Sequence, residues 1–302
     1  MQDLGWSGYR SIGLPPGGAA DRPALRIANA LVGNPGGAAG IEVALGDLEV
    51  EFEADTLFAA TGAVGTLRLD GAEVAPWTTL AARRGQHCRL APDPHGRFAY
   101  LAVDGGADLP VTLGSRATYL PAALGGHQGR RLAGGDALPC GQGAASRPAV
   151  GTVCRLEPDA GLAVRITAGP QERFFAAEAF QRIVAAPYRL SPASDRMGSR
   201  LVGEPVQARR TATLPSESTA VGAIQVPDDG QPIVLLPDGP TVGGYLKIGV
   251  VISADLARFA QVPLGGQVSF AWVTIEEAQR SVRQAAERLT RLVNEICRAP
   301  DR

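Results

Sequence analysis

Short apolar runs separated by turn-forming residues fill most of this 302-residue chain, and they limit the folds that it can adopt. Glycine and proline number 38 and 23, both above average usage. Leu48–Phe52 alternates apolar and polar residues, whereas Leu57–Ala63 and Phe98–Val103 are apolar, as half-buried and buried strands are. Asp70 and Gly71 form a typical turn between such runs. We therefore expect residues 41–140 to form a β barrel or sandwich.

Further strands and three helices are expected outside that region. The strands are expected at 162–167, 201–214, 221–226, 233–236, 246–252 and 267–273. Asp21 and Pro23 are placed to begin a short helix that Gly33 ends, and a second helix is expected at 171–184. Thr274 and Glu277 form a capping box before apolar residues that recur at steps of three and four. This last helix should pack on a core or on a partner.

The length of the chain permits two domains. Small residues fill the segment 141–151, which is the best candidate for a linker. We therefore predict an N-terminal β-rich domain over residues 1–145 and a C-terminal β-barrel domain over residues 146–302.

Composition argues against several classes of function. The net charge of −1 gives no general attraction to nucleic acid or to acidic membranes. No apolar run reaches the roughly 18 residues that span a bilayer, and no basic-then-apolar leader opens the chain, so we expect a cytoplasmic protein. Four scattered cysteines and three histidines do not form the ligand spacing of a structural zinc site, and we predict no metal site. The common dinucleotide, phosphate-loop, zinc-protease and nucleophile-elbow motifs are absent from the sequence.

Lys247 is the only lysine among 29 basic residues; all the others are arginine. It follows the glycine-rich segment Pro237–Tyr245. A lysine is a compact charge whose pKa shifts on burial, so it is suited to contact with an anion or to proton transfer. An ordinary lysine at a strand end is the alternative. Met-Lys-Met, the usual biotin attachment site, does not surround it.

Two further polar clusters contain glycine and arginine. Gly125–Leu132 includes His127 and Arg130, where glycines permit close approach of the backbone to an anion. His127 is the best candidate for proton transfer among the three histidines. A solvated hairpin loop is the alternative. In Ser194–Arg200, Asp195 stands beside Arg196, and such a pair can orient a guanidinium toward a carboxylate or phosphate. A surface ion pair of little energetic value is the alternative there.

A third cluster combines Ser216–Gln225 with Pro237–Lys247. Chain reversals at Gly230 and Gly239 would bring these segments side by side. Gln225, Thr241, Tyr245 and Lys247 would then lie close together. A glycine-rich hairpin that binds nothing is the alternative.

These segments occur together, in the same order, in one known family. They are Gln2–Gly5, Gly8–Arg10, Gly17–Asp21, Gly114–Arg116, Gly125–His127 with Gly129–Arg130, Ser194–Leu201 and Asp238–Tyr245. Along nearly the whole chain the sequence resembles the allophanate hydrolase subunit 2 family. That family includes the C-type subunit of bacterial 5-oxoprolinase and the second half of the carboxyltransferase region of urea carboxylase.

The resemblance implies a mainly β fold with two cyclophilin-like β-barrel domains, a few short helices and a C-terminal helix. It also implies a partner chain of the subunit 1, or B, type, with the active site where the two chains meet. In the oxoprolinase system a third lactam-hydrolase subunit takes part, and ATP drives opening of 5-oxoproline to glutamate. We therefore expect a subunit of an ATP-dependent amide hydrolase that is inactive alone, with ATP bound by the complex.

Two other functions remain open from the resemblance. One is a carboxyltransferase subunit that depends on biotin and transfers a carboxyl group to urea. The other is a non-catalytic antagonist of a kinase inhibitor. Two departures from the family also matter: members usually begin with a further strand before Gln2, without which a barrel edge would be unpaired, and Trp6 stands where arginine is usual.

Residue roles follow as hypotheses from the need to activate an amide carbonyl and to bind charged groups. Arg196, Arg200 and Lys247 are expected to bind the anionic part of the substrate, and Asp195 to orient an arginine. His127 or Tyr245 is expected to transfer a proton. Gln225 and Thr241 are expected to hydrogen-bond the amide. Arg116 and Arg130 complete the predicted set of substrate-binding residues.

Overall fold

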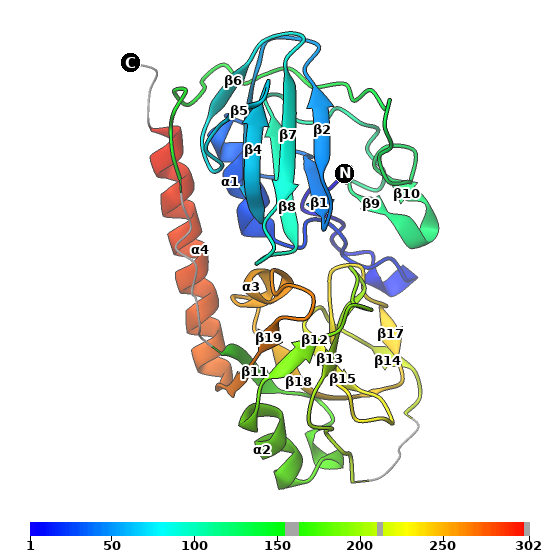
Figure 1. The fold of residues 1–302 in the computed structure, drawn as a ribbon. Coiled ribbons are helices and arrows are strands. Elements are labelled where there is room, and N and C mark those ends of the chain that lie inside the picture. The colour runs from blue at the N-terminus through cyan, green and yellow to red at the C-terminus, as the bar shows by residue number, and fades with distance from the viewer. Residues whose placement is uncertain (155–162, 210–213, 299–302) are drawn as a thin grey trace. The chain divides into compact units, whose positions relative to one another are not determined.

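The computed structural model describes residues 1–154, 163–209 and 214–298 (Figure 1). Strands dominate these residues, with few helices, so the predicted mainly β fold is confirmed. The strands are β1 Ile41–Ala44, β2 Leu48–Glu51, β3 Thr56–Gly62, β4 Val64–Leu69, β5 Ala72–Glu73, β6 Leu80–Ala82, β7 His87–Pro92, β8 Phe98–Val103, β9 Thr118–Tyr119, β10 Leu124–Gly125, β11 Val164–Ala168, β12 Tyr188–Leu190, β13 Gly198–Val202, β14 Glu217–Ser218, β15 Ala223–Val226, β16 Ile233–Leu235, β17 Val242–Gly243, β18 Leu246–Val251, β19 Gln267–Val268 and β20 Phe270–Trp272. The helices are α1 Arg22–Leu31, α2 Ala177–Ala185, α3 Leu256–Ala260 and α4 Ile275–Cys297, with 3-10 turns at Arg10–Ile12, Leu120–Ala122 and Glu172–Phe174.

The chain forms two compact units, each assembled from separate stretches of sequence. Unit 1 comprises Met1–Trp6, Gly17–Glu157 and Glu287–Arg302, and unit 2 comprises Ser7–Pro16 and Pro158–Ala286. A single boundary between residues 145 and 146 was expected from the linker composition. The units differ from that division because a short N-terminal segment belongs to unit 2 and the end of the chain returns to unit 1.

Unit 1 contains two four-stranded sheets with an apolar core. Their strand orders are β1-β8-β3-β6 and β2-β7-β4-β5. Alternating side chains of both sheets bury a shared cluster that includes Phe58, Leu67, Leu90 and Leu101. This is the sandwich-like packing that alternating apolar strands predict. Helix α1 begins as expected, because the carboxylate of Asp21 accepts a hydrogen bond from the backbone N–H of Ala24 at 3.0 Å.

Unit 2 is built on one eight-stranded sheet in the order β19-β12-β13-β16-β15-β18-β11-β20, which is nearly closed and barrel-like. All its neighbours are antiparallel except β11 and β20. A bulge lies between β15 and β18, after which Gln225 stands opposite Lys247. Bulges re-aim side chains and are frequent beside functional sites. A two-stranded pair, β14 with β17, completes the region that holds the predicted site.

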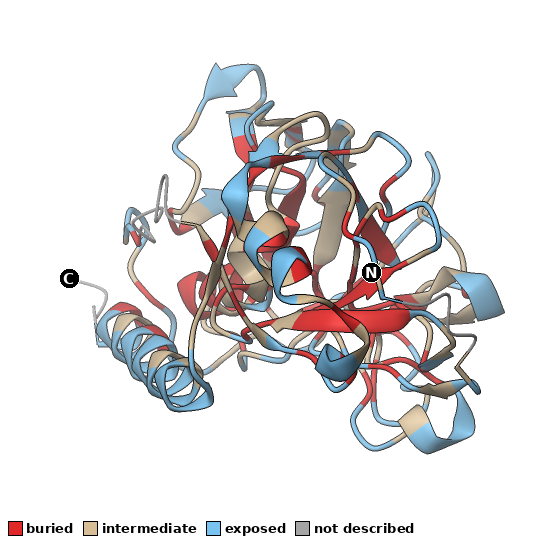
Figure 2. Ribbon diagram, turned by 90° about the horizontal axis from the view of Figure 1, so that it is seen from below, coloured by how far each residue is buried: buried red, intermediate tan, exposed pale blue. Residues whose placement is uncertain are grey.

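Helix α4 has the predicted capping box. The hydroxyl of Thr274 accepts from the N–H of Glu277 at 3.2 Å, and the carboxylate of Glu277 accepts from the N–H of Thr274 at 2.8 Å. Leu289 and Ile296 are buried against residues of α1, whereas most other residues of the helix are exposed (Figure 2). The expectation that this helix packs on a core is therefore confirmed for its last turns.

Two expected elements differ in the structure. The helix expected at 171–184 is a 3-10 turn followed by α2, because Phe175 is extended and buried and forms a bridge with Ala208. The strand expected at 201–214 ends at Val202 in β13, and residues 210–213 lie outside the described residues, as does residue 162 at the start of another expected strand. Among the described residues, no helix is both long enough and apolar enough to cross a bilayer.

Candidate active site

Lys247 lies in the interior of unit 2 and is paired with a carboxylate. Its exposed fraction is 3 %, and its Nζ lies 2.5 Å from Oε1 of Glu217. The side-chain amide of Gln171 donates to the same Oε1, while its Oε1 accepts from the backbone N–H of Lys247 at 3.1 Å. A buried ammonium is strongly destabilising unless it is paired, so Glu217 satisfies a requirement of the fold.

Gln225 stands beside Lys247 on the neighbouring strand. The two residues are opposite one another in the β15–β18 pair, so their side chains are neighbours on one face. Gln225 is 4 % exposed, and its amide nitrogen lies 2.8 Å from the place that a Cβ of Gly243 would occupy. A side chain at position 243 would require this amide to shift. We call Gln171, Glu217, Gln225 and Lys247 the Lys247 cluster.

Thr219 joins the Lys247 cluster to the N-terminal segment of unit 2. Its hydroxyl donates to the carbonyl of Pro240, and its N–H donates to the carbonyl of Thr241 at 3.0 Å. The guanidinium of Arg10 donates to the carbonyl of Thr219. Arg10 and Thr219 are both buried in part at this contact, which fixes the strand that carries Glu217.

Arg196 is held by Asp238 and not by its neighbour Asp195. Its Nε and Nη2 donate to the two carboxylate oxygens of Asp238 at 2.8 and 2.9 Å, in a bidentate pair. Asp195 instead accepts from the backbone N–H groups of Met197 and Gly198 at 2.8 and 3.2 Å. The expected orienting role of Asp195 is therefore corrected: a carboxylate adjacent in sequence closes its own turn, and a distant one orients the arginine.

A continuous chain of contacts links Arg196 to Lys247 within unit 2. Asp238 immediately precedes the turn whose carbonyls at 240 and 241 hold Thr219. Thr219 follows β14, and β14 carries Glu217, the partner of Lys247. The predicted segments Ser216–Gln225 and Pro237–Lys247 are thus brought together, as expected from the chain reversals between them.

The remaining predicted residues of unit 2 occupy less enclosed positions. Arg200 is exposed and lies on the face of β13 opposite the buried Ser199. Tyr245 is 49 % exposed, and its carbonyl accepts from Nζ of Lys247 at 3.5 Å. Thr241 is buried beside Thr219, as its backbone contact requires. Roles in binding or proton transfer stay predictions for all three.

His127 belongs to unit 1 and has an acidic neighbour. Its Nε2 lies 3.4 Å from Oδ1 of Asp136, and both side chains are 15 % exposed. Arg130 donates to both oxygens of Asp136 at 2.8 and 2.7 Å. This pairing, with the N–H of Ala133, holds the pKa of Asp136 well below its usual range. A histidine beside a fixed carboxylate is the arrangement that orients a base for proton transfer.

Arg116 also belongs to unit 1, where it joins the N-terminal motif to the Gly114–Arg116 motif. Its N–H donates to the carboxylate of Asp3 at 2.6 Å, and the hydroxyl of Ser115 donates to the other oxygen at 2.7 Å. The guanidinium of Arg116 contacts Asp108 at 2.9 Å. These contacts give a structural reason for the two motifs. Trp6, where arginine is usual in the family, donates to the carbonyl of Thr112 at 2.8 Å.

Sequence reasoning missed Gln171, Glu217 and Asp238 as side chains that hold the predicted cations. Gln171 is 76 residues from Lys247 in the chain, so no local pattern joins them. Glu217 lay inside a segment that was already singled out. An acidic residue near an isolated lysine in a buried strand is a usable signal, because such a charge requires a counter-ion.

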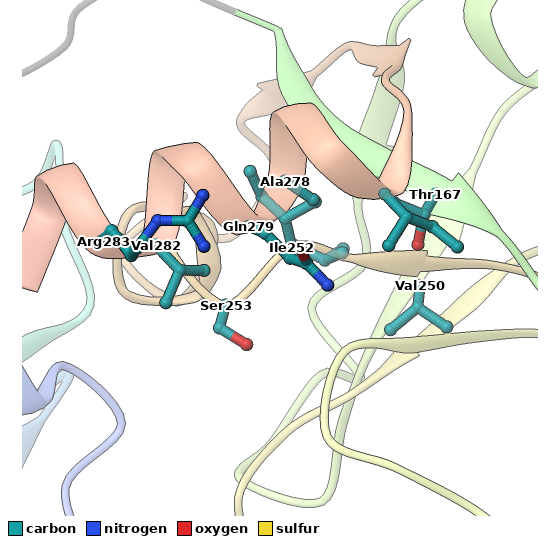
Figure 3. Close-up of a pocket in the computed structure, with 10 residues that line it drawn as sticks. Thr167, Val250, Ile252, Ser253, Ala278, Gln279, Val282 and Arg283 are labelled. Atoms are coloured by element: carbon teal, nitrogen blue, oxygen red, sulfur yellow. The ribbon is translucent and has the colours of Figure 1, made fainter.

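A separate groove of about 390 Å³ lies along the first turns of α4 (Figure 3). Apolar side chains dominate its lining, which includes Val250, Ile252, Ile275, Ala278 and Val282. It shares no lining residue with the Lys247 cluster. Within residues 1–154, 163–209 and 214–298, no group of three or more His, Cys, Asp or Glu side chains is arranged to hold a metal ion.

Comparison with known families decides the classification. The family model described as "Carboxyltransferase domain, subdomain A and B" matches residues 12–272. The chain belongs to this carboxyltransferase domain family. It is 41 % identical over 290 residues to the C-type subunit of 5-oxoprolinase from Escherichia coli, covering 95 % of this chain and 92 % of that protein. It is 35 % identical to the corresponding 5-oxoprolinase subunit of Haemophilus influenzae, covering 98 % of this chain and 96 % of that protein.

Larger proteins contain a similar region. The chain is 30 % identical to urea amidolyase of Saccharomyces cerevisiae, covering 95 % of this chain but only 17 % of that protein. The crystal structure of the K. lactis urea carboxylase superposes with a TM-score of 0.88 at 27 % identity, covering 96 % of this chain and 28 % of that chain. The crystal structure of TTHA0988 gives a TM-score of 0.79 at 32 % identity, covering 89 % of this chain and 52 % of that chain. The resemblance seen in the sequence is confirmed.

Proposed function

We propose that this chain is the C-type subunit of an ATP-dependent 5-oxoprolinase, which opens the lactam of 5-oxoproline to give glutamate. The observation that carries the proposal is the 41 % identity to such a 5-oxoprolinase subunit, which extends over 95 % of this chain and 92 % of the relative. Such end-to-end similarity indicates a chain of the same kind, not a shared module in a different protein.

The Lys247 cluster and Arg196 supply groups suited to this substrate. 5-Oxoproline carries a carboxylate next to an amide, so a site for it needs a cation and an amide partner. Lys247 and Arg196 supply the cations and Gln225 supplies the amide. Donors fixed by the fold in a water-poor site stabilise developing charge more strongly than donors in water.

In unit 1, His127 is the candidate for proton transfer. Asp136 lies beside one ring nitrogen, and Arg130 fixes Asp136. The other ring nitrogen is then the one that would act as base or acid. In unit 2, Tyr245 is the alternative, because it is 49 % exposed and its carbonyl accepts from Nζ of Lys247. The role of Arg116 in binding is supported least, since its guanidinium pairs with Asp108.

ATP would supply the driving force by phosphorylating the lactam oxygen. Water would then add to the activated carbon, the ring C–N bond would break to leave a free amine and a glutamyl phosphate, and a second water would hydrolyse the acyl phosphate to glutamate and phosphate. We assign ATP binding to the assembled complex of this chain with a B-type partner and a lactam-hydrolase subunit. The need for ATP also supports a cytoplasmic location for that complex. Biotin cannot be carried by this chain on lysine in its folded state, because Lys247 is the sole lysine and is 3 % exposed.

Carboxyl transfer in a biotin-dependent carboxylase is the second candidate. The superposition on urea carboxylase with a TM-score of 0.88 favours it. Urea also contains an amide, so Gln225 suits either substrate. The two candidates differ in what the partner complex contains: a lactam-hydrolase subunit in one, and a biotin carboxylase with its carrier in the other.

Reconstitution tests the proposal. This chain would be combined with B-type and lactam-hydrolase subunits from the same genome, and glutamate and phosphate would be measured with 5-oxoproline and ATP. We expect both products in equal amounts, and loss of both when any one subunit is left out. The opposite outcome is a complex that releases neither glutamate nor phosphate, while this chain and its partner carboxylate urea in a biotin-dependent reaction. That result would replace the 5-oxoprolinase function with carboxyl transfer.

A further inference from the structure

We propose that Glu217 is an internal stand-in for the carboxylate of the substrate. Lys247 and Gln171 then form a carboxylate-binding site that Glu217 fills until a small carboxylic acid with an adjacent amide displaces it. The choice of 5-oxoproline as that acid rests on the proposed function, but the existence of the carboxylate site does not.

Two buried donors converge on a single carboxylate oxygen. Nζ of Lys247 and Nε2 of Gln171 both contact Oε1 of Glu217, and these two residues are 3 % and 6 % exposed. The donors are also fixed to each other, since Gln171 accepts from the backbone N–H of Lys247. A cation and an amide held rigidly around one oxygen are a pre-organised site for a carboxylate.

The carboxylate that fills this site is partly open to solvent. The side chain of Glu217 is 42 % exposed although its partner is buried. Strand β14 has two residues, and within the part of the chain that the structure describes it is paired with the two residues of β17. Moving this side chain into water breaks its contacts with Lys247 and Gln171, while the hydrogen bonds of Thr219 keep the strand in place. A substrate carboxylate has the same charge, so exchange of one for the other avoids leaving Lys247 unpaired.

Gln225 indicates what the displacing ligand carries beside its carboxylate. It is 4 % exposed, and its side-chain amide lies beside Gly243. A lactam offers an N–H and a carbonyl, which are the two groups that a glutamine amide pairs with. Because Gln225 and Lys247 are opposite each other, one small molecule can reach both.

Replacement of Glu217 by alanine tests the carboxylate site without reference to catalysis. In Glu217→Ala, acetate should occupy the site and raise the thermal midpoint at constant ionic strength, whereas chloride should not. The wild type and the control Glu204→Ala should show no such acetate effect, since Glu204 pairs with Arg182 on the surface and not with Lys247. Absence of an acetate effect in Glu217→Ala overturns the proposal.

The sole lysine gives a direct reading of the substrate at the same site. Lysine labelled with 15N at Nζ would be incorporated into this chain alone, and the chain would be assembled with unlabelled partners. We expect 5-oxoproline to shift the single Nζ signal, and pyrrolidin-2-one, which lacks the carboxylate, to leave it unchanged. The variants Glu217→Ala and Glu217→Gln lack the internal carboxylate. Their apparent Kd for 5-oxoproline should be lower by about tenfold or more, because Glu217 no longer competes with the ligand for Lys247.

The outcomes separate the two proposals. Acetate binding without any 5-oxoproline shift would keep the carboxylate site and remove the assignment of 5-oxoproline to it. Two results would overturn the proposal that a substrate carboxylate displaces Glu217. One is an equal shift of the Nζ signal with 5-oxoproline and with pyrrolidin-2-one, and the other is weaker binding of 5-oxoproline by Glu217→Gln. Lack of lactam-opening activity in the reconstituted complex would contradict the proposed function alone.

Discussion

Buried carboxylates organise the arginines of unit 2. Asp238 holds Arg196 through two hydrogen bonds, and Asp255 holds both Arg165 and Arg258. Planar guanidinium groups suit such bidentate pairing, whereas the single lysine makes a point contact with Glu217. Arg196 and Lys247 are therefore already paired, and binding of a substrate to either must exchange a partner or use a remaining donor.

Asp255 gives a prediction for stability against pH. Its side chain is 3 % exposed and accepts from Arg165 at 2.6 Å and from Arg258 at 2.9 Å. Burial raises the pKa of this carboxyl, but hydrogen bonds from Arg165 and the charges of both arginines outweigh burial, so the pKa is lowered. A lowered pKa means that the stabilising contribution is present above the ordinary carboxyl pKa and is lost as pH falls through the lower folded value.

We therefore expect Asp255→Asn to lower the free energy of unfolding of unit 2 by about 3 kcal/mol at neutral pH, because it unpairs buried charge. The difference from wild type should diminish below about pH 4, where the ordinary carboxyl is protonated. Thermal midpoints measured from pH 7 downward would show this, with the exposed Asp229→Asn as the control. A difference that stays constant down to acid unfolding would contradict the account.

The candidate site was predictable at the residue scale only in part. Lys247 and Gln225 were identified because an isolated lysine and a glycine-rich segment are visible in the sequence. The two residues are opposite each other because a bulge shifts the register between β15 and β18, and no local sequence pattern predicts this bulge. Asp195 is next to Arg196 in the sequence, which suggests that it orients this arginine. In the fold Asp238 holds Arg196, and Asp195 accepts from the backbone N–H of Met197.

Among the secondary-structure elements, α4 has the clearest local cause. Thr274 and Glu277 satisfy each other's backbone N–H groups, and this reciprocal cap fixes where the helix begins. Its burial is confined to residues such as Leu289 and Ile296, so the first turns depend more on the cap than on packing. Ile275 is 63 % exposed there.

Removal of the cap should therefore act locally. We expect Thr274→Ala to destabilise the first turn by about 1 kcal/mol, which corresponds to roughly fivefold faster hydrogen exchange of its amides. Hydrogen exchange followed by mass spectrometry would measure this. Thr290→Ala, an exposed interior position of the same helix, is the control and should leave exchange of the first turn unchanged. Equal exchange in Thr274→Ala and wild type would show that the cap does not determine the helix start.

Strands were easier to predict than their ends. The apolar run Phe98–Val103 is β8 without change, because a buried central strand must be apolar on both faces. The region 171–184 was harder, since its apolar spacing is helical throughout. Phe175 leaves the helix to bridge Ala208 and to place its ring 6.3 Å from that of Phe180. A tertiary contact of this kind overrides local propensity.

At the scale of the whole molecule, each compact unit is discontinuous in sequence. Residues 7–16 belong to unit 2, where Arg10 contacts Thr219, and residues 287–302 belong to unit 1. A linear search for linkers assumes that a domain is one stretch of chain, so it cannot find such exchanges. The mainly β class was predictable because it depends on the spacing of turns and apolar runs, which the sequence displays directly.

The predicted catalytic and substrate-binding residues belong to both units. His127, Arg116 and Arg130 belong to unit 1, while Asp195, Arg196, Arg200, Gln225, Thr241, Tyr245 and Lys247 belong to unit 2. Within unit 2, hydrogen bonds from Thr219 to the carbonyls of Pro240 and Thr241 join the predicted segments. The proposed function includes a partner chain, so the assays that test it use the assembled complex.

The kcat/KM of ATP-dependent 5-oxoproline opening by the complex containing Lys247→Met tests the central claim most directly. Methionine keeps the apolar stem of the lysine and removes its charge. We predict a loss of about 100-fold or more, the scale expected when a fixed charge partner is removed, with complex assembly unchanged and with the exposed Arg288→Met control at the wild-type rate. A Lys247→Met complex within twofold of wild type would contradict the claim that this buried cation serves the reaction.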